Sequence, residues 1–218
     1  MQQMVGGFLT RNWTMIPHVT HNDDADVTAM EAFRKQLADE KDVRVTGLVF
    51  LIKAVVAALR KYPQFNASLD DSGSLVLKKY FHVGIAVDTP GGLLVPVLRD
   101  CDKKSVVELA SELAAISEKA RTKGLSTPEM SGGCITISAL GALGGTSFTP
   151  IINAPEIAIL GVTRTREVPV RDGDGLTWRQ MLPLSLSYDH RVINGADAAR
   201  FTRSIADNLV DPQALVGN

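Results

Sequence analysis

The run GLVFLIKAVVAAL, residues 47–59, restricts the fold more than any other stretch of this sequence. Its apolar side chains recur at helical spacing but cover more than one face, so other elements must pack around the helix. Lys53 interrupts the run, which is also too short to span a bilayer. Pro63 stops the helix. We therefore expect a buried helix in a sizeable core, which a chain of 218 residues can build.

Three other segments have the pattern of amphipathic helices. Residues 28–40 and residues 195–209 place apolar side chains at helical spacing. Residues 105–123 begin with a Ser-x-x-Glu capping box and carry basic side chains in the last turn. Gly124 supplies the stop after this helix.

Strand patterns collect in the middle and at the end of the sequence. They cover residues 74–88, 93–100, 133–138, 156–170 and 176–189. Pro90-Gly91-Gly92 and Asp172-Gly173-Asp174-Gly175 have the chemistry of turns between neighbouring strands. Because long helices separate some of these strands, we predict one α/β domain over residues 1–218, a mixed sheet with helices packed on it.

Composition argues against several classes of protein. Apolar residues make up 45% of the chain and charged residues 22%, as in an ordinary globular protein. The net charge is −1 with scattered cations, so no nucleic-acid surface is expected. No secretory signal or membrane span is visible. Cys101 and Cys134 suggest neither a disulfide framework nor a metal motif, and we expect both to be unreactive in a reducing, cytoplasmic setting.

The segment LSLSYDHRVINGADAARF contains the first candidate for chemistry. Its leucines share one strand face and its serines the other, and the strand runs directly into His190. Asn194 is well placed to cap the following helix, with Asp197 in the first helical turn. The spacing allows two interpretations. One is a strand, a turn and a capped helix, and the other is a catalytic base at the end of a sheet.

Ser138 is the second candidate, at the end of the strand CITIS and just before a glycine-rich loop. That loop lacks the Lys-Ser/Thr ending of a phosphate-binding loop, so a simple flexible connection is the alternative. His18 and His21 are three residues apart, but no matching cluster of further ligands is visible. We therefore expect no metal site.

The sequence SYDHRVINGADAARF resembles the active-site motif Asp-His-Arg-x-x-Asp-Gly of the dihydrolipoamide acyltransferases, the core components of the 2-oxo acid dehydrogenase complexes. Other segments resemble the same catalytic domain in the same order: RNWTMIPHVTH, FNASL, VGIAVDTPGGLLVPV, GGCITISALGALGGTSFTPIINAPEIAILGV and LPLSLSYDHR. The resemblance covers nearly the whole chain. FTPIINAPEIAILGV is most similar to the bacterial, pyruvate-type, acetyl-transferring members.

This resemblance implies a fold like that of chloramphenicol acetyltransferase and a homotrimer with active sites at subunit interfaces. Beyond the trimer it implies a 24-subunit cubic cage that works with 2-oxo acid dehydrogenase and dihydrolipoamide dehydrogenase subunits. Coenzyme A and dihydrolipoamide would be the substrates, reaching the site from opposite ends of a channel. The lipoyl group would be carried on a domain that this sequence does not contain.

The resemblance also implies roles for individual residues. His190 matches the general base, and Ser138 matches the hydroxyl that binds the oxyanion of a tetrahedral intermediate. Asn194 matches a position that helps to organise the site. The implied reaction is direct acetyl transfer between two thiols, in which His190 and Ser138 come from different subunits or meet only in the trimer. Three further positions match residues that brace the site or lie near the channel: Arg34 and Asp88 as an ion pair, and Phe148.

Three departures from the family pattern change what we expect. Asn194 replaces the commoner Asp, which excludes a mechanism that needs a carboxylate there. The lipoyl and subunit-binding domains that precede the family's catalytic domain are absent, so we expect an isolated catalytic core. The ending QALVGN offers only Leu215 and Val216 as part of the apolar anchor that joins trimers into a cage.

Two alternatives to the acyltransferase remain open. One is a self-assembling scaffold in which catalysis is secondary or lost. The other is an antibiotic acetyltransferase of the same fold, which would accept a hydroxyl rather than a thiol. Acetylation of dihydrolipoamide or of chloramphenicol would distinguish them.

Overall fold

The computed structural model describes residues 2–41, 43–70 and 72–216. Its helices are α1 (Gln2–Met15), α2 (Thr28–Lys41), α3 (Gly47–Lys61), α4 (Val106–Thr122), α5 (Gly195–Val210) and α6 (Pro212–Val216), with short 3₁₀ helices η1 (Pro63–Phe65) and η2 (Thr127–Met130). Its strands are β1 (His18–Asp26), β2 (Ala67–Leu69), β3 (Leu75–Leu77), β4 (Val83–Ile85), β5 (Val87–Thr89), β6 (Gly92–Leu94), β7 (Val97–Leu98), β8 (Ile135–Ala139), β9 (Ala158–Val162), β10 (Arg166–Asp172) and β11 (Gly175–Asp189).

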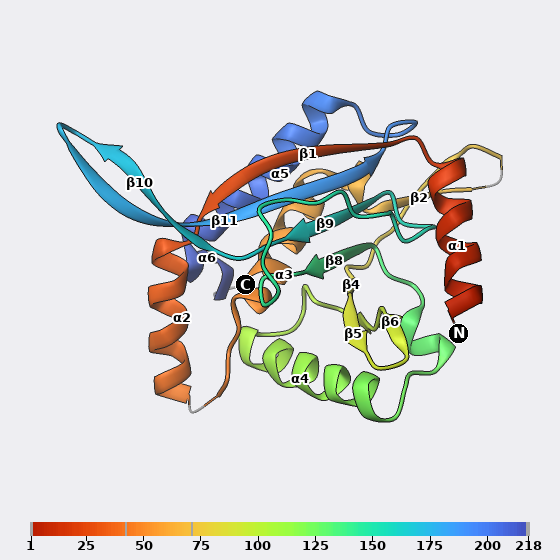
Figure 1. The fold of residues 1–218 in the computed structure, drawn as a ribbon, viewed down its shortest axis with the longest axis horizontal. Helices are drawn as coiled ribbons and strands as arrows, with labels where there is room; N and C mark the ends of the chain where they lie inside the picture. The colour runs from red at the N-terminus through yellow and green to blue at the C-terminus, as the bar shows by residue number, and fades with distance from the viewer. Residues whose placement is uncertain (1, 42, 71, 217–218) are drawn as a thin grey trace.

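The main sheet is mixed, as the sequence predicts. Within the described residues its strand order is β1-β11-β9-β8-β4-β7, and β8 runs parallel to both of its neighbours. The long strand β11 pairs with β10 over its first half and with β9 over its second half. The β10–β11 hairpin consequently projects from the body of the molecule (Figure 1).

One face of this sheet builds the main core. Ile135 and Ile137 of β8, together with Leu186 of β11, are fully buried in a cluster that includes α3 and α5. Helix α3 buries side chains around its circumference, which confirms the helix expected at residues 47–59. The Lys53 ammonium within this helix donates to the Lys104 carbonyl at 3.0 Å, so a charge is tolerated there.

The opposite face of the sheet is polar and still buried. It carries Thr136 of β8 and Ser187 of β11, each 1% exposed. The Ser187 hydroxyl is hydrogen-bonded to Thr20 of β1 at 2.8 Å. Residues 140–157 pass over this face, where Ile152 N–H donates to the His18 ring at 2.9 Å and Asn153 donates to Thr136 at 3.3 Å. This segment therefore links β1, β8 and β9 across the polar face of the sheet.

The local signals at the helix ends are confirmed. Ser105 and Glu108 form the predicted capping box at the start of α4. Gly124 follows α4 with φ +74°, a conformation that suits glycine. Helix α3 ends at Lys61, two residues before Pro63.

Three of the predicted strands are broken. Residues 93–100 contain the end of β6 and all of β7, with Val95 and Pro96 between them. Residues 74–88 divide into β3, β4 and β5. Between β3 and β4 the carbonyls of Lys78 and Tyr80 accept hydrogen bonds from the Asn66 side-chain amide, so the chain bends there from one sheet to the other. Residues 156–170 divide into β9 and β10. At that break the Arg164 guanidinium binds the carbonyls of Gly141 and Ala142 instead of continuing a ladder.

Helix α1 and strand β1 were not predicted. Among the described side chains of α1 only Asn12 is buried. The helix therefore lacks the stripe of buried apolar residues from which a helix is predicted. Strand β1 is mostly polar and is held by pairing with β11 along its whole length. No helix in the described part of the chain is long and apolar enough to cross a membrane.

The two apolar residues of the predicted C-terminal anchor, Leu215 and Val216, pack on the core of their own chain. Leu215 is 5% exposed and belongs to the core of its own chain, beside α3 and α5. In this structure Leu215 therefore contacts its own chain, and its role in an anchor between trimers stays a prediction. Val216 is partly buried against the same core, and Gly217 and Asn218 lie outside the described residues.

Candidate active site

His190 lies immediately after β11, in the turn that leads to α5. The Asp189 carbonyl accepts hydrogen bonds from Val192 N–H at 3.0 Å and from Ile193 N–H at 2.9 Å, which closes the turn. His190 N–H donates to the Pro17 carbonyl at 3.1 Å. The strand therefore stops at Asp189, and the His190 side chain is exposed at the end of the sheet instead of lying on the apolar face.

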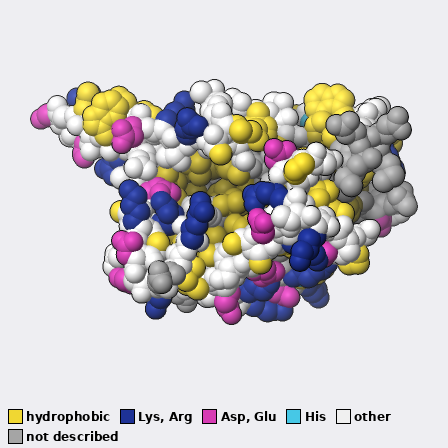
Figure 2. Space-filling view, turned by 60° about the horizontal axis from the view of Figure 1, so that its bottom comes forward, with side chains coloured by type: hydrophobic (Ala, Val, Ile, Leu, Met, Phe, Trp, Pro, Cys, Tyr) yellow, Lys and Arg dark blue, Asp and Glu magenta, His cyan; other side chains and the backbone are white. Residues whose placement is uncertain are grey.

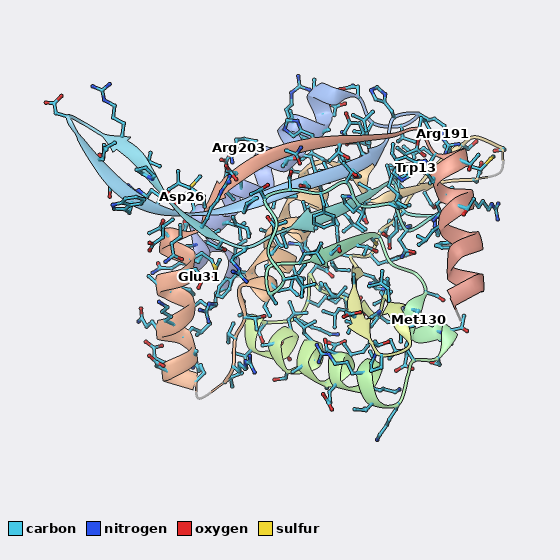
Figure 3. The ribbon with its side chains drawn as sticks, in the orientation of Figure 1. Trp13, Asp26, Glu31, Met130, Arg191 and Arg203 are labelled. Atoms are coloured by element: carbon cyan, nitrogen blue, oxygen red, sulfur yellow. The ribbon has the colours of Figure 1, made fainter. Side chains whose placement is uncertain are left out.

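This end of the sheet is the one beside α1. Figure 3 shows Arg191 and Trp13 at that end, and Asp26 and Glu31 at the opposite end. A small cleft of about 330 Å³ is lined by residues 13–18, which include Pro17, the acceptor of the His190 N–H.

Asn194 caps α5 as predicted. Its Oδ1 accepts from Asp197 N–H at 2.9 Å, and its Nδ2 donates to the Asp197 carboxylate at 2.8 Å. The side chain is exposed and lies four residues after His190. The cap therefore fixes where α5 begins relative to the histidine.

His190 differs from His18 and His82, which are less exposed, in what its ring binds. The His18 ring accepts from Ile152 N–H and faces the Ile16 carbonyl at 2.8 Å, so both of its nitrogens are used. The His82 ring accepts from Asp100 N–H at 3.0 Å, and burial lowers the pKa of His82. Within the described residues no group hydrogen-bonds to the His190 ring, whose centroid is 5.7 Å from that of Tyr188. His190 is thus free to bind a ligand.

Ser138 lies in β8, half-buried on the polar face of the sheet. It pairs with Gly161 of β9, and the Phe148 ring covers this glycine. A Cβ added at Gly161 would be 2.6 Å from Phe148 Cζ, so no side chain fits between them. Phe148 therefore lies beside the strand position of Ser138. None of the described residues hydrogen-bonds to the Ser138 hydroxyl.

Ser138 and His190 are far apart within one chain. Ser138 is level with Gly161, which is level with Ser185 of β11. His190 follows Ser185 by five residues, a displacement of about 17 Å along the strand at ~3.4 Å per residue, and two strand spacings add about 10 Å sideways. A base and an oxyanion donor must each come within about 3 Å of the reacting atoms. One chain therefore cannot bring both to the same substrate.

The predicted ion pair between Arg34 and Asp88 is not formed in the chain. The Arg34 guanidinium donates to Glu31 at 2.8 Å and to the Val45 carbonyl at 3.0 Å. Asp88 is exposed on β5, where its backbone pairs with Leu93 of β6. Within one chain Arg34 is therefore paired with Glu31, one helical turn before it, and the pair with Asp88 stays a prediction.

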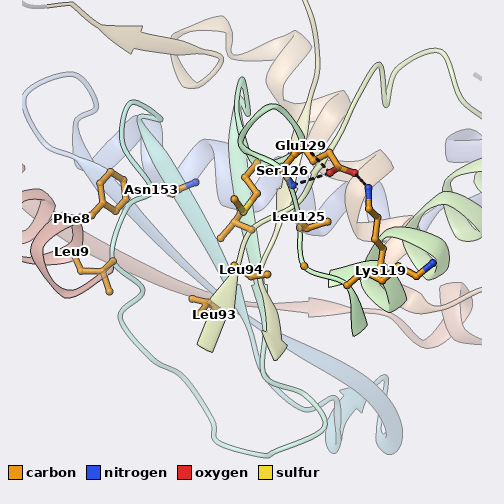
Figure 4. A pocket seen from close by; sticks show the side chains of 13 residues that line it. Phe8, Leu9, Leu93, Leu94, Lys119, Leu125, Ser126, Glu129 and Asn153 are labelled. Carbon is orange, nitrogen blue, oxygen red and sulfur yellow. Dashed lines mark hydrogen bonds and ion pairs between the residues drawn. The ribbon is translucent and has the colours of Figure 1, made fainter. Parts of the chain in front are cut away.

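A larger cleft of about 790 Å³ opens between α1, β6 and the end of α4 (Figure 4). Phe8 and Leu9 form one side, and the Leu93–Leu94 segment of β6 lies between them and α4. On the far side of the cleft, the Lys119 ammonium forms an ion pair with the Glu129 carboxylate at 2.6 Å. In space-filling view, apolar side chains are exposed in a hollow flanked by lysines and arginines on the face that carries α4 (Figure 2).

The inner wall of this cleft leads to the polar face of the sheet. Asn153 lines the cleft and donates to the Thr136 hydroxyl at 3.3 Å. Thr136 and Ser138 lie two residues apart on the same face of β8. The cleft thus lies beside the polar face that carries Ser138, at the side of the molecule where α1 lies.

Glu156 is a buried acid that the sequence analysis missed. It is 4% exposed, its Oε1 is 3.5 Å from Asn153 Nδ2, and its Oε2 has no partner among the described residues. Burial raises the pKa of Glu156 to about 7, opposed by hydrogen bonding to Thr136 and by the charge of Lys78. A carboxylate directly before the apolar run IAIL was the available signal.

The surroundings of both cysteines disfavour the reactive thiolate. Both are free and buried. Burial raises the pKa of Cys101 to about 12, with Asp102 as a minor contributor, and burial also raises the pKa of Cys134. The described residues contain no group of three or more His, Cys, Asp or Glu that could hold a metal ion.

The sequence matches the family described as "2-oxoacid dehydrogenases acyltransferase (catalytic domain)" over residues 1–217. The dihydrolipoyllysine-residue acetyltransferase component of pyruvate dehydrogenase complex from Cupriavidus necator is 55% identical over 97% of this chain and 38% of its own length. The protein of that name from Pseudomonas aeruginosa is 53% identical over 99% of this chain and 40% of its own length. The chain thus spans well under half the length of these relatives.

The structure is similar to solved structures of the same family. One is the dihydrolipoamide acetyltransferase of Azotobacter vinelandii, studied for the role of a serine, a histidine and an asparagine in its catalytic mechanism. It has a TM-score of 0.94 and 53% identity over 98% of this chain and 89% of that one. The cubic core of the pyruvate dehydrogenase multienzyme complex also has a TM-score of 0.94 at 53% identity, over 98% of this chain and 90% of that one.

Chloramphenicol acetyltransferase shares the fold, with a TM-score of 0.60 at 17% identity over 92% of this chain and 94% of that one, which confirms the predicted fold type. In the Azotobacter vinelandii enzyme, the serine, histidine and asparagine are spaced along the chain as Ser138, His190 and Asn194 are here. On this match of sequence and structure, the chain belongs to the 2-oxo acid dehydrogenase acyltransferase family and covers its catalytic domain.

Proposed function

We propose that this chain transfers an acetyl group between dihydrolipoamide and coenzyme A, as the catalytic part of the core of a pyruvate dehydrogenase complex. The observation that carries the proposal is the exposed His190 at the end of β11, with Ser138 and Asn194 at the spacing described for the Azotobacter vinelandii enzyme. The names of relatives at 55% and 53% identity support the acetyl group and the pyruvate complex.

The reaction needs a base because a free thiol has a pKa of about 8.5 and attacks only as the thiolate. The neutral His190 ring removes the proton of the incoming thiol as its sulfur adds to the thioester carbonyl. The Ser138 hydroxyl donates to the oxyanion that forms. The intermediate then collapses, and the leaving sulfur takes the proton from the His190 imidazolium. The acetyl group passes directly between the two sulfurs.

The site is assembled from two chains in this proposal. The support is the separation of Ser138 and His190 along the sheet, which leaves each chain with a serine half and a histidine half. A homotrimer with three equivalent interfaces completes both halves in every chain. The relative solved as a cubic core supports further assembly into a cage of 24 chains.

The partners follow from the same proposal. The lipoyl group reaches the site on a separate domain, and 2-oxo acid dehydrogenase and dihydrolipoamide dehydrogenase subunits load and reoxidise it. A cytoplasmic location is also part of the proposal, supported by two cysteines that are both free and buried. No metal is required by the chemistry.

The test is acetyl transfer from acetyl-coenzyme A to free dihydrolipoamide, with assembly measured by light scattering. His190→Ala should lower the rate roughly 10²–10⁴-fold. Ser138→Ala should lower it about 10²–10³-fold. Near-normal turnover of assembled His190→Ala would refute the mechanism. An assembled but inactive parent chain would favour the scaffold, and acetylation of chloramphenicol instead would favour the antibiotic acetyltransferase.

A further inference from the structure

Asp189 and Arg191 flank His190, and the proposed reaction gives neither of them a role. The Arg191 guanidinium donates to the Asp189 carboxylate from Nη2 at 2.6 Å and from Nε at 2.9 Å. The Arg191 backbone N–H donates to the same carboxylate at 3.0 Å. The Asp189 side chain is 3% exposed, whereas that of Arg191 is 44% exposed. These bonds join the two residues on either side of His190, so the backbone of His190 lies within a closed loop.

The backbone on each side of the histidine is fixed as well. Asp189 N–H donates to the Ile157 carbonyl at 2.9 Å, and His190 N–H donates to the Pro17 carbonyl at 3.1 Å. The end of β11 is therefore held between β1 and the start of β9 up to the residue that carries the imidazole. The remaining freedom of His190 is rotation of its side chain beside Tyr188.

A carboxylate next to a catalytic histidine often accepts a hydrogen bond from the imidazole, which orients the ring and stabilises its charged form. The Asp189 carboxylate instead binds the Arg191 side chain and backbone. Charge-assisted bonds of this geometry are strong and directional, so the pair fixes the path of the turn.

We propose that Asp189 and Arg191 form a positioning clamp that holds His190 through the backbone of the turn and not through a bond to its imidazole. The proposal rests on the role of His190 as the base in the proposed function. Positioning has a large effect on rate, because a displacement of about 1 Å at a reacting group can cost about 10²-fold.

The test compares Asp189→Asn, Arg191→Gln and the double variant with the parent, each as an assembled protein. The matched control is Asp100→Asn, which removes another ion-paired carboxylate, bound to Lys103 at 2.9 Å. Asp100 follows β7, across the sheet from β11. The measurements are kcat, the KM for each thiol substrate, the pH dependence of kcat/KM, thermal unfolding and particle size.

We expect each single variant to lower kcat about 10–10²-fold with KM nearly unchanged. The double variant should be no worse than the poorer single one, because both substitutions break the same unit. The apparent pKa of the pH profile should stay where it is in the parent, and the control should match the parent throughout. If Asp189→Asn does not assemble, Arg191→Gln alone tests the proposal, because the exposed Arg191 side chain can be replaced with less disturbance of the fold.

Three results would overturn the clamp. A fall of one unit or more in the apparent pKa of Asp189→Asn would make Asp189 an electrostatic partner of the imidazole. A higher KM for coenzyme A in Arg191→Gln, at unchanged kcat, would make Arg191 a substrate contact. Full activity of both single variants, with His190→Ala inactive, would refute the clamp and leave the proposed function intact. An inactive assembled parent would refute both proposals.

Discussion

Ser138 and His190 lie at opposite ends of the same sheet, although the sequence marks both as members of one active site. The register from β8 through β9 to β11 fixes this separation, and no rotation of the side chains can close it. A site that uses both residues must therefore take the serine from one chain and the histidine from another.

Mixing two inactive variants should therefore restore activity. Ser138→Ala chains keep His190, and His190→Ala chains keep Ser138. When equal amounts are dissociated and reassembled together, roughly one quarter of the interfaces in a ring should contain both intact residues. The measurement is acetyl transfer by the reassembled mixture, with each variant reassembled alone as the control. A mixture as inactive as its components would show that the two residues do not act across an interface.

Phe148 and Gly161 should behave as a coupled pair. Gly161→Ala places a Cβ 2.6 Å from Phe148 Cζ, so the ring must move away from the strand position of Ser138. We expect a loss of about 1–3 kcal/mol of unfolding free energy together with reduced activity. Gly161→Ala with Phe148→Leu should recover part of both. Gly175→Ala is the control, because its added Cβ meets nothing closer than 3.7 Å. Additive effects of Gly161→Ala and Phe148→Leu would contradict the coupling.

Glu156 should make stability depend on pH near neutrality. Burial raises its pKa from 4.5 to about 7, so between these values the native chain keeps a proton that the unfolded chain releases. The free energy of unfolding should therefore fall as pH rises through this window, by about 3 kcal/mol in total, and level off above it.

Glu156→Gln cannot ionise and should remove this slope. Denaturant unfolding at fixed chain concentration from pH 4.5 to 8 measures it for the parent, for Glu156→Gln and for Glu118→Gln, whose side chain is exposed on α4. The parent and Glu118→Gln should keep the slope. An equal slope in Glu156→Gln would mean that another group releases the proton.

Two substitutions at Asn194 should distinguish its role as a helix cap from a role in catalysis. Asn194→Ala removes the acceptor of Asp197 N–H and should cost about 1 kcal/mol of unfolding free energy. Asn194→Ser keeps an acceptor for the cap but loses the amide N–H₂ group, so it should keep most of the stability. If Asn194 also organises the site, activity should fall in both variants. Full activity in Asn194→Ser would restrict the residue to capping.

Helices α2 to α5 were predictable because their signals are local. The capping box at Ser105 and the cap at Asn194 each involve residues three apart, and the apolar run of α3 is continuous in sequence. The alternation that ends at Tyr188 likewise located the second half of β11. These features depend on neighbours along the chain, which a single sequence displays.

The features that failed depend on distant residues. Strand β1 forms because β11 offers it a partner, and its polar sequence alone does not indicate a strand. The break after β9 depends on Arg164 binding carbonyls more than 20 residues earlier in the chain. Arg34 forms an ion pair with Glu31 of its own helix, a contact that the sequence analysis did not predict and that only the placed side chains reveal.

The candidate site shows the same division. Its residues were identified by motif, but their separation follows from strand register, and the Asp189–Arg191 pair follows from the closed turn. Glu156 was missed because its unusual property is burial, which depends on Asn153, Thr136 and the start of β8 folding around it.

A further consequence follows from the distance between Ser138 and His190. A newly made chain holds only unmatched halves, so under the proposed function it is latent and gains thioester chemistry when a neighbour arrives. Assembly would then serve as the activating step, with no need for cleavage or modification. Stray single chains would leave the cell's acetyl-coenzyme A untouched, and activity per chain would fall on dilution wherever the assembly dissociates.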